Sequence, residues 1–250
     1  MIGKHKRIPS LHRSLMVILA ATIVASGPAL ASKKEAPPQT TPEGLKLAES
    51  TKTTLVYLAD DVDFGIYNKV YIVDCAVAFA KNWQRNYNRD ERELSRKVQD
   101  KDVQRMKDDL SAEFKKVFTQ TMIDNGLDVV TELGPGVIVL RPAILNLVVN
   151  APDIQSASMA RTYTADAGQM TLYLELYDGV SNAMLAEVMD AQSAGRVAPT
   201  MTYANRTTNI QAADRILKKW ANELASHFGT ATGGEFADDD AADDKTEAKD

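Results

Sequence analysis

Histidine and cysteine are scarce in this chain of 250 residues, which has three His and one Cys. His5 and His12 lie within the first 31 residues, so the rest of the chain keeps only His227 and Cys75. A tetrahedral zinc site needs several Cys or His ligands, and a disulfide needs two cysteines. The sequence therefore excludes a Cys/His zinc site, a haem held by two histidines and an intramolecular disulfide after residue 31. We expect no metal centre and no cofactor.

Basic charge is also limited. The chain has 29 Lys and Arg residues against 34 Asp and Glu residues, which gives a formal net charge of -5. Proteins that bind the phosphate backbone present a basic face, and the sequence has none, so we expect no nucleic-acid partner. Much of the acidic excess lies in residues 235–250, which hold eight acids and two lysines. Like charge and low hydrophobicity predict an acidic disordered tail over residues 230–250.

The N-terminal segment has the three parts of a secretory signal peptide. A basic start with Lys4 and Arg13 precedes an apolar stretch from Leu15 to Ala25, and Ala29-Leu30-Ala31 then supplies small residues for signal peptidase. The apolar stretch is shorter than the ~20 residues that span a bilayer. We therefore predict a Sec-type signal peptide over residues 1–31, cleaved after Ala31, and a periplasmic or secreted mature protein without a transmembrane segment.

Cleavage would make Ser32 the first residue of the mature chain. Because no Cys stands at this position, we expect no lipid anchor. The cleavage removes four basic residues and no acids, so the formal charge changes from -5 to -9. Residues 32–44 lack periodicity, which predicts a flexible leader. The opposing interpretation, an N-terminal anchor helix, is disfavoured by the short apolar stretch.

The middle of the chain has the pattern of a sheet. Residues 137–149 form an almost unbroken apolar run, which is typical of a deeply buried strand. In residues 170–177 apolar and polar residues alternate, as in a strand with one covered face and one solvent-exposed face. Residues 184–192 follow a short turn and are expected to return as a partner strand. Further strands are predicted at Lys69–Phe79 and Leu127–Val130.

Two segments, residues 100–125 and 208–228, have the spacing of amphipathic helices. Asn125-Gly126 and Gly229 are expected to end these helices. The expected order is strand, helix, four strands, helix. It predicts an α+β fold in two layers, with a mostly antiparallel sheet of about five strands and two amphipathic helices on one face. We assign a single α+β domain to residues 45–229.

Three stretches are less regular. Gly44–Ser50 is expected to start a short helix, and Leu55–Leu58 is expected to be an extended arm lying on the domain. Trp83–Asp90 is polar and aromatic, which favours a surface excursion.

Several segments, in order, resemble a known family: Leu140–Ile144, Ala151–Asp153, Ala167–Asp178 and Arg215–Ala221. Together they resemble the bacterial envelope family known as domain of unknown function thirty-three thirteen, over residues 45–228. The resemblance implies an exported and often lipid-anchored protein with no assigned activity and no agreed catalytic residues. The chain departs from the lipoprotein members because it has no Cys at the cleavage point.

Arg141 interrupts the apolar run, and a charge in a buried strand is costly unless it is paired. One interpretation is a structural ion pair with Glu175 or Glu187 on a neighbouring strand. The other is a groove that binds an anionic ligand, because a guanidinium suits bidentate capture of a carboxylate or phosphate. The candidate ligand-binding residues for this groove are Arg141, Arg161, Tyr163 and Tyr177.

The sequence has no nucleophile elbow, phosphate-binding loop or metal motif, so we assign no catalytic residues. We predict an exported, non-enzymatic interaction or structural protein of the periplasm. Its partner is expected to be another envelope protein, bound at the sheet edge or at the long loop of residues 152–166. One alternative is a periplasmic binder of a small anionic ligand. A second is a hydrolase of envelope polymers, with candidate carboxylates at Asp153, Asp166, Glu175 and Asp178.

Overall fold

The computed structural model describes most of the chain between residues 36 and 229. The described ranges are 36–152, 162–164, 168–194, 202–204 and 206–229. The chain divides into two compact units, Met1–Ala36 and Pro37–Asp250, and all elements below belong to the second. The predicted signal peptide and the predicted acidic tail lie outside the described residues.

The structure contains ten strands, three α-helices and two short 3-10 helices in the described ranges. In chain order they are β1 (Lys46–Ser50), β2 (Thr54–Leu58), η1 (Phe64–Ile66), β3 (Lys69–Ile72), β4 (Ala76–Phe79), α1 (Trp83–Asp90), η2 (Leu94–Arg96), α2 (Asp100–Asp124), β5 (Asp128–Val129), β6 (Val137–Val149), β7 (Thr162–Thr164), β8 (Gly168–Asp178), β9 (Met184–Ser193), β10 (Thr202–Ala204) and α3 (Arg206–Gly229).

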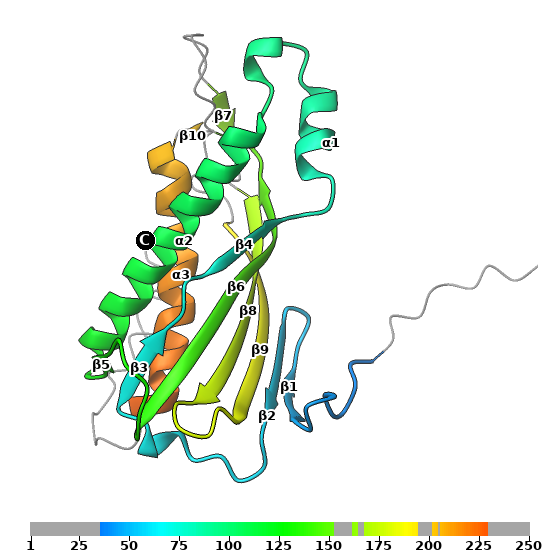
Figure 1. The fold of residues 1–250 in the computed structure, drawn as a ribbon. Coiled ribbons are helices and arrows are strands. Elements are labelled where there is room, and N and C mark those ends of the chain that lie inside the picture. The colour runs from blue at the N-terminus through cyan, green and yellow to red at the C-terminus, as the bar shows by residue number, and fades with distance from the viewer. Residues whose placement is uncertain (1–35, 153–161, 165–167, 195–201, 205, 230–250) are drawn as a thin grey trace, which may run out of the picture. The chain divides into compact units, whose positions relative to one another are not determined.

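Eight of these strands form one mixed sheet (Figure 1). Its order is β1-β2-β9-β8-β6-β3-β5, and β4 pairs with β6 beyond the end of β3. The ladders that join β1, β2, β9, β8 and β6 are antiparallel. By contrast, β3 and β4 run parallel to β6, and β5 runs parallel to β3. Strands β7 and β10 pair separately as a two-stranded sheet.

The long central pair β6 and β8 sets the register of the sheet. Ile138 lies opposite Asp178 at one end of the pair, and Val149 lies opposite Gly168 at the other. Gly168 has a φ of 137°, and a Cβ there would overlap the carbonyl oxygen of Val148, so this end of the ladder requires glycine. The predicted alternation in β8 is confirmed, since one set of side chains is buried: Met170, Leu172, Leu174 and Leu176.

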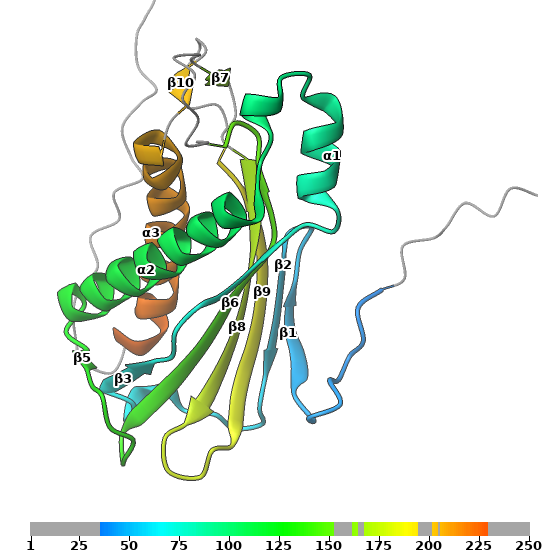
Figure 2. The same cartoon turned by 45° about the horizontal axis from the view of Figure 1, so that its top comes forward.

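Helices α2 and α3 cover one face of the sheet (Figures 1 and 2). Phe114 and Phe118 of α2 are fully buried, and their stacked rings have centroids 3.9 Å apart. Leu217 and Trp220 of α3 are buried in the same core. These side chains recur at helical spacing, so the predicted apolar stripes are confirmed. The predicted α+β class, with two long helices on one face of a sheet, is likewise confirmed.

The sheet has more strands than expected. Lys46–Ser50 forms β1 rather than the start of a helix, and Leu55–Leu58 belongs to β2, which pairs with β9 rather than lying as an arm on the domain. Tyr57 of β2 is buried, and its hydroxyl donates to the Pro38 carbonyl at 3.1 Å, which the short apolar patch in the sequence did not reveal. The predicted strand Lys69–Phe79 is divided into β3 and β4. The division lies beside Pro142 of β6, which has no N–H to donate to a ladder.

The segment Trp83–Asp90, expected as a surface excursion, is helix α1. Trp83 fixes it to the domain, because its ring stacks on Phe79 with centroids 4.3 Å apart and its Nε1–H donates to the Val149 carbonyl at 3.3 Å. Within the described part of the chain, no helix is both long and apolar enough to span a bilayer.

Asp190 is a buried carboxylate that ties β9 to α3 and β2. It accepts hydrogen bonds from Trp220 Nε1–H at 2.7 Å, from the Thr54 hydroxyl at 2.7 Å and from the Gln192 side-chain amide at 2.6 Å. Its side chain lies in the core, where an unsatisfied polar group is costly. The three donors offset that cost, so Asp190 fixes the position of α3 over the sheet.

Asp190→Ala is expected to lower the free energy of unfolding by about 3 kcal/mol, because the buried Trp220 indole N–H loses its acceptor. Urea denaturation measures this change. Asp60→Ala is the matched control, since Asp60 forms an exposed ion pair with Lys46 at 2.8 Å and its loss should cost less than about 1 kcal/mol. Equal effects of the two substitutions would contradict the role given to Asp190.

Candidate functional site

The face of the sheet that points away from α2 and α3 carries a compact group of polar and aromatic side chains. We call this group the open-face patch; its members are Arg141, Tyr173, Glu175, Tyr177 and Glu187. They share one face because successive side chains in a strand point to opposite sides, and the alternate residues of β8 are buried under the helices. The patch therefore follows from the alternation of β8 and from its two neighbouring strands.

Arg141 lies at the β6 side of this patch. Its guanidinium carbon is 4.2 Å from the centroid of the Tyr177 ring, which is cation–π geometry. Its Nη2 also donates to Asn182 Oδ1 at 3.2 Å. Arg141 is exposed, and although it lies opposite Glu175 in the ladder, it forms no ion pair with any carboxylate that the structure describes. The predicted structural ion pair with Glu175 or Glu187 is therefore wrong, because the arginine turns onto the tyrosine ring instead.

Glu175 is held by the two tyrosines that flank it on β8. The Tyr173 hydroxyl donates to Glu175 Oε1 at 2.9 Å, and the Tyr177 hydroxyl donates to Oε2 at 3.0 Å. Burial, the hydrogen bond to Glu175 and the charges of Glu187 and Glu175 raise the pKa of Tyr173. The hydroxyl therefore remains protonated and remains a donor at neutral pH.

Glu187 of β9 lies directly opposite Glu175. Like charges at directly opposed positions on one face of a sheet are destabilising. Burial raises the pKa of Glu187, a hydrogen bond from Tyr173 lowers it, and the charges of Glu43 and Glu175 raise it. The patch thus keeps two acidic side chains close together, next to aromatic rings.

The acidic side chains and tyrosine rings of the patch are an arrangement that can bind a cation. In the described ranges no group of three His, Cys, Asp or Glu residues is placed to hold a metal ion. Cys75 is buried between β3 and β4, and burial raises the pKa of its thiol to about 12, so its nucleophilic thiolate is scarcely formed at neutral pH. Paired carboxylates beside tyrosine rings instead suit a lysine or arginine side chain.

Asp178, one of the carboxylates considered for hydrolysis, holds the turn between β8 and β9. Its Oδ1 accepts hydrogen bonds from the backbone N–H of Ser181 at 2.6 Å, from the Ser181 hydroxyl at 2.7 Å and from the Val180 N–H at 3.1 Å. Tyr67 donates to its other oxygen at 3.0 Å. These bonds, those of Ser181 first, lower the pKa of Asp178 to about 2.

Of the residues predicted to bind an anion, the structure brings Arg141 and Tyr177 together. Tyr163 lies on β7, which pairs with β10, but its side chain is outside the described part. Arg161 and the carboxylates of Asp153 and Asp166 also lie outside the described residues.

Sequence reasoning missed Tyr173 as a site residue and named Glu187 only as a pairing partner. The signal for Tyr173 was present, because it shares the parity of Glu175 and Tyr177 in the alternating strand. Nothing in the sequence indicated that Glu187 faces Glu175, since that depends on the register of β8 with β9.

Comparison with solved structures gives matches of low identity. The chain is similar to the PelC dodecamer protein of Paraburkholderia phytofirmans, with 12% identity, a TM-score of 0.36, and coverage of 69% of this chain and 96% of that chain. It is also similar to a minor lipoprotein of Acinetobacter baumannii, with 13% identity, a TM-score of 0.28, and coverage of 66% and 94% respectively. Scores this low carry no argument about activity or assembly. A comparison with curated proteins gives no match.

A family model gives the informative match. The model described as protein of unknown function (DUF3313) matches residues 42–224, from just before β1 to the last turns of α3. The matched range contains the whole sheet, α2 and the open-face patch. It confirms the resemblance found in the sequence over residues 45–228. The chain therefore belongs to the family of proteins of unknown function DUF3313.

Proposed function

We propose that this chain is an exported, non-enzymatic protein of the cell envelope that binds a protein partner through the open-face patch. The observation that carries the proposal is the opposed pair Glu175 and Glu187, which lies on the sheet face opposite to the residues buried under the long helices. Side chains that break a local stability rule are expected at functional or strained sites. A partner that supplies a positive charge would relieve the repulsion.

The composition of the patch suits a protein interface. Tyrosine and arginine are enriched at the centres of protein interfaces, and they supply much of the binding free energy there. Tyr173, Tyr177 and Arg141 are the members of this type. The acidic pair adds charge complementarity, which selects a partner that presents a lysine or arginine. The partner is thus a protein segment with a basic side chain that reaches between Glu175 and Glu187.

The two alternatives have less support. A small anionic ligand at Arg141 and Tyr177 would also meet the negative charge of Glu175, which lies opposite Arg141. A hydrolase would need an acid and a base around a substrate, but Glu175 is bound by two tyrosine hydroxyls and Asp178 by its own turn. Both alternatives remain predictions.

Export is the first part of the proposal to test. When the full chain is expressed in a bacterium with two membranes, we expect a periplasmic protein whose N-terminal residue is Ser32, because the Ala29-Leu30-Ala31 site is cleaved. N-terminal sequencing and the intact mass of the periplasmic fraction measure this. Ala31→Arg is the control and should block cleavage. A cytoplasmic protein that keeps residues 1–31 would contradict export.

The open-face patch is tested by photo-cross-linking in cells. A photoreactive amino acid at Thr171, on the same face of β8 as the patch, is expected to give a discrete protein adduct, whereas one at the exposed Gln120 of α2 is not. Glu187→Arg should reduce the Thr171 adduct about tenfold or more, because a basic partner is then repelled. An adduct that also forms from Gln120, or that is unchanged in Glu187→Arg, would contradict this proposal.

The cost of the acidic pair predicts a pH-dependent gain in stability for Glu187→Gln. The pKa of Glu187 is raised in the folded protein, so ionisation of this carboxyl destabilises the fold. The loss of stability develops as pH rises through the raised pKa. At pH 7 the variant should be more stable than wild type, by less than about 1 kcal/mol because the site is partly solvated. The difference should shrink below pH 4.5, the ordinary value. Urea denaturation at both pH values measures it.

The control for this measurement is Glu49→Gln, since Glu49 is an exposed carboxylate on β1. It should change the free energy of unfolding little at either pH. A stabilisation of the Glu187→Gln variant that is the same at both pH values would show that charge is not its cause.

A further inference from the structure

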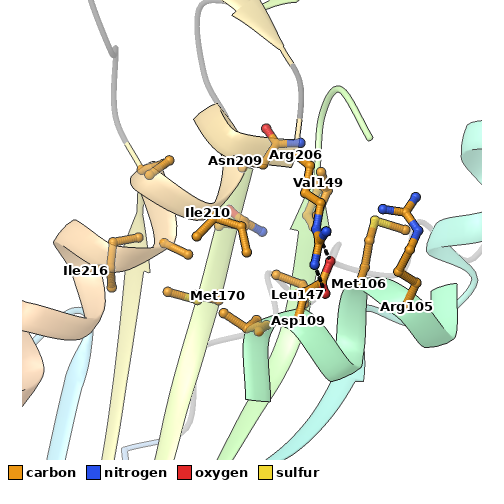
Figure 3. A pocket seen from close by; sticks show the side chains of 17 residues that line it. Arg105, Met106, Asp109, Leu147, Val149, Met170, Arg206, Asn209, Ile210 and Ile216 are labelled. Carbon is orange, nitrogen blue, oxygen red and sulfur yellow. Dashed lines mark hydrogen bonds and ion pairs between the residues drawn. The ribbon is translucent and has the colours of Figure 1, made fainter. Parts of the chain in front are cut away.

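An apolar cavity lies at the end of the sheet where α3 begins (Figure 3). Its floor comes from β6 and β8, and its walls come from the first half of α2 and the first turns of α3. The apolar lining residues that carry the argument are Met106, Leu147, Met170, Ile210, Ala213 and Ile216. These elements meet only in the tertiary structure, because they belong to segments far apart in the chain, from Met106 of α2 to Ile216 of α3.

The size and lining of the cavity limit what it can hold. Its volume is ≈ 90 Å³, whereas an engineered apolar cavity of ~150 Å³ accepts a benzene ring. The smaller volume suits the end of a linear chain better than a ring. The fitting occupant is therefore the end of an aliphatic chain.

One side of the cavity is polar, and we call this side the rim; its residues are Arg105, Asp109, Arg206 and Asn209. Arg206 binds Asp109 through two hydrogen bonds, with Nε to Oδ2 at 2.8 Å and Nη2 to Oδ1 at 2.6 Å. Asn209 donates to the carbonyl of Ala151 at 3.0 Å. Because Arg206 and Asn209 are exposed or half-buried, the rim marks the side of the cavity that reaches the surface.

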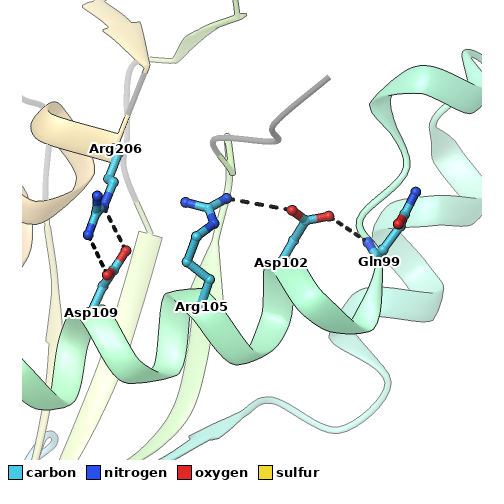
Figure 4. A network of polar contacts seen from close by, with 5 residues as sticks. All are labelled: Gln99, Asp102, Arg105, Asp109 and Arg206. Carbon is cyan, nitrogen blue, oxygen red and sulfur yellow. Dashed lines mark hydrogen bonds and ion pairs between the residues drawn. The ribbon is translucent and has the colours of Figure 1, made fainter. Parts of the chain in front are cut away.

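The charged side chains of the rim are paired with opposite charges. Arg105 approaches Asp102 at 3.6 Å, and Asp102 also accepts a hydrogen bond from the N–H of Gln99 at 3.0 Å at the start of α2 (Figure 4). Both guanidinium groups are thus oriented by carboxylates on one side of the helix. A polar head group at this rim would meet fixed donors and acceptors, while the apolar interior would determine the affinity.

We propose that this cavity binds the end of a linear aliphatic chain whose polar head group lies at the rim. The chain comes from a free fatty acid or from the acyl chain of a membrane lipid, which share this chemistry. The site is separate from the open-face patch and does not depend on the proposed protein partner.

The test uses the mature chain, residues 32–250, and a series of saturated fatty acids. Calorimetry or displacement of a fluorescent fatty acid should show that affinity rises about fourfold for each added methylene, until the cavity is full. Ile210→Ala enlarges the cavity and should move this plateau to longer chains. Vesicles of bacterial phospholipid form the second arm: binding to vesicles as well as to the acids identifies lipid as the source, and binding to the acids alone identifies free fatty acid.

Ala213→Leu fills the cavity from the α3 side and should weaken binding at least tenfold. Its matched control is Ala191→Leu, which adds the same side chain at an exposed position of β9 and should leave binding unchanged. Thermal unfolding verifies that both variants fold, and the plateau shift in Ile210→Ala tests the site even if Ala213→Leu does not fold. No binding at any chain length, affinity independent of chain length, or wild-type affinity in folded Ala213→Leu would overturn the proposal.

Discussion

The burial of one face of β6 and β8 under α2 and α3 is the constraint on which the rest of the structure depends. Ile138, Leu140 and Ile144 of β6 and the alternate residues of β8 meet Phe114 and Phe118 of α2 in one core. Because strand side chains alternate, covering this face fixes which residues point the other way. Arg141, Glu175 and Tyr177 are placed on the opposite face by that rule.

The two faces of the same strands therefore have different roles. The covered face supplies stability, and Asp190, held by Trp220 and Thr54, fixes α3 against it. On the opposite face, the like charges of Glu175 and Glu187 face each other across the β8–β9 ladder, which is unfavourable for folding. At the far end of the sheet the packing of α2 and α3 leaves a cavity. Recognition is thus proposed for the two regions where packing is incomplete or electrostatically unfavourable.

Much of the element pattern could be predicted from the sequence. The long apolar run of β6, the alternation of β8 and the helical stripes of α2 and α3 were all predicted, because each reflects a local period imposed by a buried face. Short elements were predicted poorly. Strand β2 and helix α1 are fixed by partners distant in sequence, which are β9 for β2 and the Val149 carbonyl for Trp83.

The sequence by itself determined the α+β class and the scarcity of reactive side chains, since composition and local periodicity are enough for both. Only the tertiary structure decided that Glu187 lies opposite Glu175, that Arg141 turns onto Tyr177, and that α2 and α3 leave a cavity beside Met170. The reason is that register and packing join segments far apart in the chain. A local pattern shows which face of a strand or helix is buried, but it does not show which residues of another segment that face meets.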